Sequence, residues 1–274
     1  MKAGIRLIAM DMDGTLLNPD GQVTEYSRQV LRECEARGIR IILASGRSFY
    51  NLREFYKDIG LKSPVLSVNG VRADDSPMGP LLFDSVLDED VVRKALKVLR
   101  REKVHFDLFT RDEIYSEYLN PLYNWHDRNE VILTDGMRQE IVVENPERTD
   151  REGAPQAYKL IIMSPDGALL QRLAEELHPL DIDITTSGGY NIEIAQRGVN
   201  KGSGLKKLAR HYGIEREQVM AFGDYLNDLE MLEWAGESFA MDNAIPEIHA
   251  IARHRARSNA EDGVARAIEE FVLC

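Results

Sequence analysis

Short apolar runs recur along the chain, and helical patterns separate them. Runs of this kind stand at residues 5–10, 39–44, 65–68, 219–222 and 238–241. Continuous apolar runs of this length are typical of strands that are buried on both faces of a parallel sheet. The helical patterns between them, for example over residues 24–37 and 201–212, predict the crossover helices of βαβ units. The pattern therefore predicts an α/β fold built on a doubly wound parallel sheet.

The pattern changes between the third and fourth runs. From residue 84 to residue 189, strand-like segments mix with helical patterns in an order that is typical of an α+β domain. Directly after it, residues 190–194 are expected to pair with residues 181–185 across a glycine-rich turn. We therefore expect a core formed by residues 1–83 and 190–274, with an inserted α+β domain at residues 84–189.

Two carboxylates follow the first run directly. Asp11 and Asp13 precede Gly14, and the carboxyl ends of parallel strands are where ligands bind in open α/β sheets. Carboxylates this close together repel one another unless a cation or a shared proton relieves them. A hard divalent ion such as Mg²⁺ would do so and would also neutralise phosphate oxygens. A surface turn is the alternative interpretation, since Asp and Gly are turn formers.

The other strands bring further polar side chains to the same edge. They are Ser45, Asn69, Asp224 and Asp228, with Lys201 before the fourth run. Phosphoryl transfer from a monoester requires a nucleophile in line, a proton donor for the leaving alcohol and fixed positive charge on the phosphoryl oxygens. A carboxylate can be the nucleophile, through an aspartyl-phosphate, and a second carboxylate can act as acid and then as base. The set therefore predicts phosphoryl-transfer chemistry.

Composition narrows the possible partners. The net charge of −12 argues against a general nucleic-acid binder, but a bound metal and a few cations can reverse the field in one cleft that takes phosphate. No apolar stretch reaches transmembrane length, and the N-terminus lacks a signal-peptide pattern. Cys34 and Cys274 have no metal-ligand spacing. We expect a cytoplasmic monomer or small homo-oligomer with no nucleic-acid or membrane partner.

Five motifs in a fixed order resemble those of haloacid dehalogenase superfamily phosphatases, specifically the Cof-type branch with a type IIB cap. They stand at residues 11–17, 45–47, 200–202, 223–232 and 258–265, with a cap-sized insert between the second and the third. The resemblance covers essentially the whole chain. It implies a Rossmann-like core, a cap that sets substrate specificity, and Mg²⁺-dependent hydrolysis of small phosphorylated metabolites, such as sugar phosphates, through an aspartyl-phosphate.

The resemblance also implies roles for the acidic residues. Asp11 would be the nucleophile and a metal ligand. Asp13 would be the general acid and base, with its backbone carbonyl on the metal. Asp224 would be a direct metal ligand, while Asp228 would be either a ligand or an anchor behind the metal.

The phosphate-binding residues are implied in the same way. Ser45 and Lys201 would hold the transferring phosphoryl group, and Lys201 would also balance the charge of Asp11. For Arg47, a substrate contact and a structural ion pair stay about equally open. The candidates to bind substrate or phosphate are Met12, Ser45, Gly46, Arg47, Asn69, Lys201 and Asn227.

Two other functions stay open. A phosphomutase of the same branch would need an activating bisphosphate and would release no phosphate. A catalytically silent sugar-phosphate sensor would be expected to lack Asp11, Asp13 or a metal carboxylate, and all of these are present. Tyr225 and Leu226 depart from the smaller or polar residues that are usual in the family, so we expect a different shape for the loop beside the metal.

Overall fold

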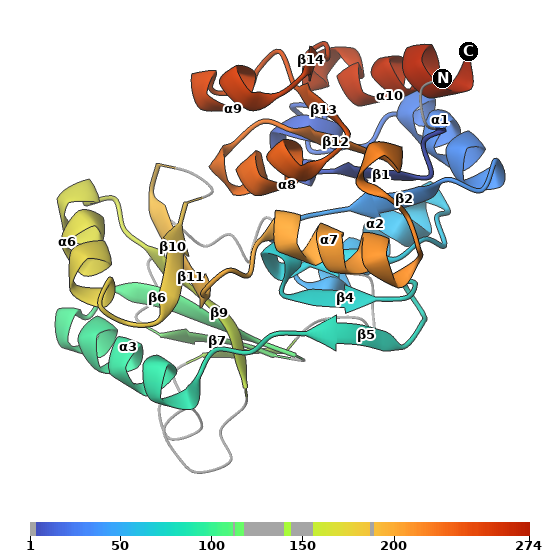
Figure 1. Cartoon of the computed structure of the whole chain (residues 1–274). Helices are drawn as coiled ribbons and strands as arrows, with labels where there is room; N and C mark the ends of the chain where they lie inside the picture. Colours follow the sequence, from blue (N-terminus) through green and yellow to red (C-terminus); the bar gives the residue numbers. More distant parts are fainter. Residues whose placement is uncertain (1–3, 112, 118–139, 144–155, 187–188) are drawn as a thin grey trace. The chain divides into compact units, whose positions relative to one another are not determined.

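The computed structural model describes residues 4–111, 113–117, 140–143, 156–186 and 189–274. It divides into two compact units, which are coloured by sequence in Figure 1. Unit 1 consists of Met1–Asp84 and Asn200–Cys274, and unit 2 consists of Ser85–Val199. The chain therefore leaves unit 1, forms unit 2 and returns.

The second boundary of the insert lies later in the chain than expected. Strand β11, Asn191–Gln196, pairs antiparallel with β10, Ile182–Thr185, and with β9, Ala157–Met163. Residues 190–199 therefore belong to unit 2, and the expected insert at residues 84–189 is corrected to Ser85–Val199. The reason is that β11 pairs both with β10, as was expected, and with β9, and these two pairings hold it in unit 2.

Parallel strands form the main sheet of unit 1, in the order β14-β13-β12-β1-β2. Their bounds are Leu7–Met10 for β1, Arg40–Leu43 for β2, Val219–Gly223 for β12, Glu237–Ala240 for β13 and His254–Arg255 for β14. In the register, Leu7 lies opposite Arg40 on one side and Val219 on the other. This confirms the predicted α/β fold with a parallel sheet.

A small antiparallel sheet adjoins the end of the main sheet. It consists of β3, β4 and β5, with the bounds Val65–Ser67, Arg72–Asp74 and Leu81–Asp84. A parallel bridge between Ala44 and Leu66 links β3 to the chain that follows β2. Strand β3 thus continues the parallel order, whereas β4 and β5 form a hairpin that the hydrophobic pattern did not predict.

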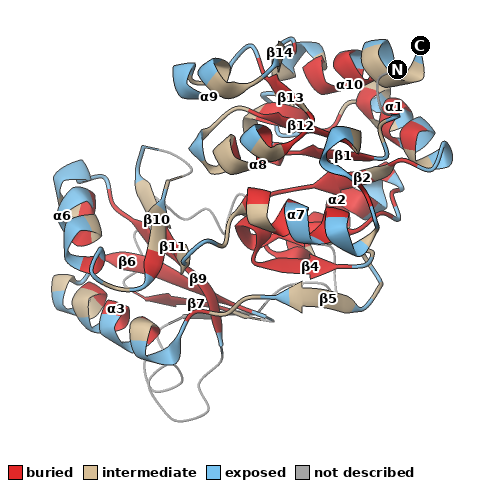
Figure 2. Ribbon diagram, in the orientation of Figure 1, coloured by how far each residue is buried: buried red, intermediate tan, exposed pale blue. Residues whose placement is uncertain are grey.

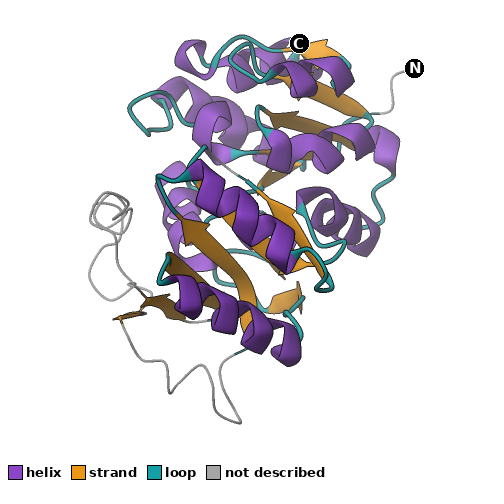
Figure 3. Ribbon diagram, turned by 90° about the vertical axis from the view of Figure 1, so that its left-hand side faces the viewer, coloured by secondary structure: helices purple, strands orange, loops and turns teal. Residues whose placement is uncertain are grey.

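Helices cover both faces of the main sheet, as Figure 3 shows by secondary structure. One face carries α7, α8 and α9, which share a hydrophobic core with Leu7, Ala9 and Ile42. The alternate residues, such as Ile8, are equally buried, and α1, α2 and α10 cover their face, as right-handed crossovers require. The bounds are Glu25–Ala36 for α1, Phe49–Ile59 for α2, Lys201–His211 for α7, Leu229–Trp234 for α8, Pro246–Ile251 for α9 and Gly263–Ile268 for α10.

Unit 2 is an α+β domain with a sheet in the order β10-β11-β9-β6-β7-β8. Its strands β6, β7 and β8 span His105–Thr110, Glu113–Glu117 and Glu140–Val143, and its helices α3 and α6 span Glu89–Glu102 and Gly167–Leu177. Neighbouring strands are antiparallel except for β7 and β8. The buried strands and the buried sides of α3 and α6 are red in Figure 2. This confirms the expected change from parallel to mixed sheet.

In the part of the chain that the structure describes, no helix combines the length and the hydrophobicity needed to cross a membrane.

Candidate active site

The loop after β1 turns sharply and buries its first residue. Asp11 is buried, and the next residues form one wide turn in which the Leu17 N–H donates to Met12 O at 2.9 Å. Gly14 adopts φ +81° in this turn, a conformation that L side chains rarely adopt. The Thr15 hydroxyl donates to Asp224 Oδ1 at 2.6 Å. The loop therefore connects the ends of β1 and β12, which are neighbours in the sheet.

Gly14 is required by its neighbour as well as by its backbone angle. A Cβ atom at this position would lie 2.3 Å from Asp224 Oδ2, which is a severe clash. We expect Gly14→Ala to lose about 1–2 kcal/mol of stability from the backbone angle and to displace the Asp224 carboxylate, with turnover falling roughly 10²-fold. Gly21→Ala is the matched control, because Gly21 has φ +74° and no atom within 4 Å of its Cβ position. Equal turnover in the two variants, measured beside their melting temperatures, would contradict this role of Gly14.

Lys201 lies at the first position of α7 and reaches into the site. Asn200 caps the helix, since its Oδ1 accepts from the Ser203 N–H at 2.8 Å. The Lys201 ammonium lies 2.6 Å from Asp11 Oδ1 and 2.7 Å from Asp228 Oδ1, and the lysine is fully buried. One buried cation therefore joins two buried carboxylates from different strand ends.

Asp228 also holds the loop that follows β12. Its second oxygen, Oδ2, accepts from the backbone N–H of Asp224 at 3.0 Å and of Tyr225 at 3.3 Å. Gly223 lets this carboxylate approach, because a Cβ there would lie 2.5 Å from Asp228 Cβ. Asp228 is thus a structural anchor of the loop as well as a partner of Lys201.

Three carboxylates converge at this edge of the sheet. Asp11, Asp224 and Asp228 each offer one oxygen, and these oxygens all lie within 4.8 Å of one another. Burial raises the pKa of Asp11 well above its usual range, the Lys201 charge opposes the shift, and Asp228 and Asp224 add to it. Burial likewise raises the pKa of Asp224 to about 6. Burial lowers the pKa of Lys201, but the negative charges of Asp11 and Asp228 raise it by more, so the pKa of the lysine lies above its usual range.

This donor set fits a hard divalent cation. Three carboxylates face one ammonium group, so the cluster keeps an excess of negative charge when all are ionised. Oxygen donors of this kind are the ligands of Mg²⁺ and Ca²⁺. The predicted metal ligands Asp11, Asp224 and Asp228 are thus brought together. The Asp13 side chain points elsewhere, to Arg47.

The loops after β2 and β3 pack together beside this cluster. Ser45 is buried, and its carbonyl accepts from the Asn69 N–H at 2.9 Å. Asn69 takes φ +54°, and its Oδ1 accepts from Asn227 Nδ2 at 3.4 Å. A Cβ at Gly46 would lie 3.2 Å from Asn69 Oδ1. The predicted phosphate-binding residues Ser45, Gly46, Asn69 and Asn227 therefore form one connected group in unit 1, and Met12 is fully buried in the neighbouring turn.

Arg47 forms the ion pair that was one of its two open interpretations. Its Nε donates to Asp13 Oδ2 at 2.9 Å and its Nη2 donates to Asp13 Oδ1 at 2.7 Å. Its Nη1 donates to Asn51 Oδ1 at 2.9 Å. The guanidinium group of Arg47 thus pairs with the carboxylate of Asp13, the residue expected to act as general acid and base.

Asn243 and Asn259 support the first loop and were not among the predicted site residues. Asn243 Nδ2 donates to Gly14 O at 2.8 Å, and its Oδ1 accepts from the Asn259 N–H at 3.1 Å. Asn259 Nδ2 in turn donates to Leu17 O at 2.7 Å. Asn259 lies in the last of the five sequence motifs, so that motif was the signal from which its support of the loop after β1 could have been predicted.

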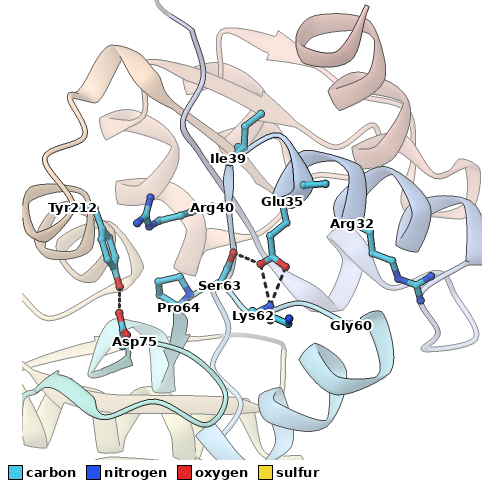
Figure 4. Close-up of a pocket in the computed structure, with 12 residues that line it drawn as sticks. Arg32, Glu35, Ile39, Arg40, Gly60, Lys62, Ser63, Pro64, Asp75 and Tyr212 are labelled. Carbon is cyan, nitrogen blue, oxygen red and sulfur yellow. Dashed lines mark hydrogen bonds between the residues drawn. The ribbon is translucent and has the colours of Figure 1, made fainter.

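A pocket of about 580 Å³ lies at the opposite edge of the sheet and contains none of these residues. Figure 4 shows its polar groups bonded to one another. Glu35 accepts from the Lys62 N–H and the Ser63 hydroxyl, and Tyr212 donates to Asp75 at 2.7 Å. The lining residues are Arg32, Glu35, Ala36, Gly38, Ile39, Arg40, Gly60, Lys62, Ser63, Pro64, Asp75 and Tyr212. The converging carboxylates Asp11, Asp224 and Asp228 lie outside this pocket.

The sequence model of the haloacid dehalogenase-like hydrolase family matches residues 8–268, which is nearly the whole chain. The chain belongs to this family. The expected resemblance is thus confirmed, and so is the expectation of an enzyme. The family match spans both units and the residues of all five motifs.

Several curated relatives of this chain are named as phosphatases. The 5-amino-6-(5-phospho-D-ribitylamino)uracil phosphatase YwtE of Bacillus subtilis is 28% identical, with 98% of each chain covered. The HMP-PP phosphatase of Cronobacter sakazakii is 31% identical over 91% of this chain and 88% of its own. A haloacid dehalogenase-like hydrolase from B. subtilis has a solved structure with a TM-score of 0.86, 29% identity and coverage of 97% of this chain and 100% of that one.

Proposed function

We propose that this haloacid dehalogenase-like hydrolase is a Mg²⁺-dependent phosphatase of small phosphorylated metabolites that works through an aspartyl-phosphate at Asp11. The observation that carries the proposal is the buried cluster in which Lys201 lies 2.6 Å from Asp11 and 2.7 Å from Asp228, with Asp224 beside them. A structural ion pair alone needs no third carboxylate. A site for phosphoryl transfer needs a nucleophile, a metal and fixed positive charge together.

In the first half of the reaction, Asp11 attacks phosphorus. Its Oδ1 is held by the Lys201 ammonium, so the carboxylate stays in one orientation with Oδ2 available to form the new P–O bond. The ester P–O bond breaks, and Asp13 gives a proton to the leaving oxygen. Lys201, the Ser45 hydroxyl and the Met12 N–H are the groups proposed to bind the phosphoryl oxygens.

In the second half, water releases the phosphate. Asp13, now ionised, takes a proton from the attacking water, and the acyl-phosphate bond to Asp11 breaks. Asp11, Asp224 and Asp228 would hold Mg²⁺, with Asp13 contributing its carbonyl oxygen, and the ion would neutralise charge on the phosphoryl oxygens. The products are an alcohol and inorganic phosphate, and the enzyme returns to its starting state.

The substrate class is proposed from the relatives. One curated relative is named for a phosphoribitylamino-uracil and another for HMP-PP, and both names denote small phosphorylated compounds. We propose that unit 2 is the cap that selects among such substrates, since its sheet and helices form a separate compact domain inserted between the second and third motifs.

The direct test is phosphate release across a panel of sugar phosphates, nucleotides and cofactor phosphates, with and without Mg²⁺. We expect release from some members of the panel, and only when Mg²⁺ is present. Isomerisation without release would favour a phosphomutase. Tight binding of one phosphorylated compound without release would favour a sugar-phosphate sensor.

Mg²⁺ should also stabilise the folded protein. A ligand that binds only the folded state at 100 times its dissociation constant adds about 2.7 kcal/mol, so saturating Mg²⁺ should raise the melting temperature. Asp224→Asn should abolish most of this shift, because it removes one of the three converging oxygens. Asp20→Asn, at an exposed position in the loop after the first motif, should keep the full shift. An unchanged melting temperature in the wild type would contradict the proposed metal site.

A further inference from the structure

The guanidinium group of Arg47 binds the protein through all three of its nitrogens. Two of them form a bidentate pair with Asp13, at 2.9 and 2.7 Å, and the third donates to Asn51 Oδ1 at 2.9 Å. Bidentate pairing of this kind fixes the direction of a carboxylate as well as its position. The contact joins the loop after β1 to the loop after β2.

Residues at the start of α2 contact Arg47 and restrain it. Asn51 lies in the first turn of α2 and is buried, and its own N–H donates to the Ser48 hydroxyl at 3.3 Å. The guanidinium carbon lies 5.4 Å from the centre of the Phe55 ring. The Arg47 backbone N–H donates to the Ser45 hydroxyl at 3.3 Å. The start of α2 therefore fixes the arginine, and the arginine is only 16% exposed.

Asp13 is in the opposite situation, since its side chain is 64% exposed. Among the hydrogen bonds of the described residues, those from Arg47 are the ones that restrain its carboxylate. A side chain this exposed would otherwise sample several rotamers. Proton transfer demands that the acid be held within hydrogen-bond reach of the reacting oxygen.

We propose that Arg47 is a positioning residue that orients Asp13 for proton transfer, and that it is not a ligand of the transferring phosphoryl group. The proposal rests on the proposed function, because it assigns the acid and base role to Asp13. The Arg47 guanidinium group pairs with Asp13, whose side chain is not part of the buried carboxylate cluster. The Lys201 ammonium lies within that cluster, where the phosphoryl group is expected. Arg47 thus acts through Asp13.

The decisive experiment is a double-mutant cycle on the best substrate of the panel. Arg47→Met should lower kcat roughly 10- to 100-fold, part of the 10²- to 10⁴-fold that acid–base catalysis supplies, with KM within about threefold. Arg47→Lys should recover part of the loss. On an Asp13→Asn background, Arg47→Met should have no further effect, because two residues that act as a unit are not additive.

The leaving group provides a readout that a merely structural role would not move. p-Nitrophenolate leaves without needing a proton, so the effects of Asp13→Asn and Arg47→Met should both shrink with p-nitrophenyl phosphate compared with an alkyl phosphate. Arg28→Met is the control, because Arg28 pairs with Asp58 at 2.7 Å on the surface of the same unit. It removes an arginine–aspartate pair and should leave kcat unchanged.

Binding of inorganic phosphate, followed by calorimetry, tests the proposal without turnover. Arg47→Met should keep the affinity of the wild type within about threefold, as expected of a residue outside the phosphate subsite. A tenfold or greater loss of phosphate affinity would overturn the proposal, and so would an equal effect of Arg47→Met with and without Asp13. If Asp13→Asn leaves turnover unchanged, the acid and base role in the proposed function fails, and this inference fails with it.

Discussion

Replacing Asp11 with Asn should abolish phosphate release while the protein stays folded. Asn has nearly the same shape, but its amide cannot form the aspartyl-phosphate, and removal of a nucleophile costs at least about 10⁴-fold in turnover. The melting temperature should stay the same or rise when no metal is present. The reason is that burial and the neighbouring carboxylates raise the pKa of Asp11, so its ionised form is costly in the folded state at neutral pH.

The measurement combines phosphate release with a thermal melt and with peptide mass spectrometry of enzyme quenched in acid during turnover. The wild type should carry a phosphoryl group on the peptide that contains Asp11, and Asp11→Asn should carry none. Asp58→Asn, at an exposed position on α2, serves as the control and should retain full activity. A variant without Asp11 that still releases phosphate at a tenth of the wild-type rate would show that another group is the nucleophile.

Replacing Lys201 with Met should lower both the turnover and the free energy of unfolding, and its effect on turnover should be second only to that of Asp11→Asn. The ammonium lies between Asp11 and Asp228 in a fully buried position. Removing one partner of a buried charge cluster costs about 3–5 kcal/mol, since the remaining charges lose their compensation. Turnover should fall roughly 10²- to 10⁴-fold, in line with the loss of fixed positive charge at a phosphoryl group. Urea denaturation and phosphate release measure the two effects.

A second variant separates stability from catalysis at Lys201. The double variant that carries Lys201→Met and Asp228→Asn has one fewer uncompensated buried carboxylate. Much of the lost stability should therefore return, while turnover stays low. Lys206→Met is the matched control, because Lys206 lies on the same helix α7 at an exposed position, and it should change neither quantity. A Lys201→Met protein with normal turnover would mean that the lysine serves folding alone.

The domain boundary and the β4–β5 hairpin show the limits of what pattern predicts about the fold. The parallel strands were predictable because a strand that is buried on both faces appears in the sequence as a short run of consecutive apolar residues. In the hairpin, β4 is buried but is only three residues long and includes Arg72 and Asp74, and β5 is only partly buried. The pairing of β11 with the neighbouring β10 was predicted, whereas its pairing with β9 joins segments that lie further apart in the sequence. Pairing between distant segments has no local signature.

By itself, the sequence determined the parallel sheet and the set of chemical groups at its edge. Asp11, Ser45 and Asp224 each follow an apolar run, and because parallel strands share one chain direction, these residues lie at the same edge of the sheet. Only the tertiary structure decided which of these side chains contact one another. Lys201 contacts both Asp11 and Asp228. Arg47 pairs with Asp13, and Asn243 donates a hydrogen bond to the turn at Gly14. These contacts depend on rotamers and on the separation of loops to within an ångström. That geometry is set by packing between segments far apart in the chain, so composition and spacing do not contain it.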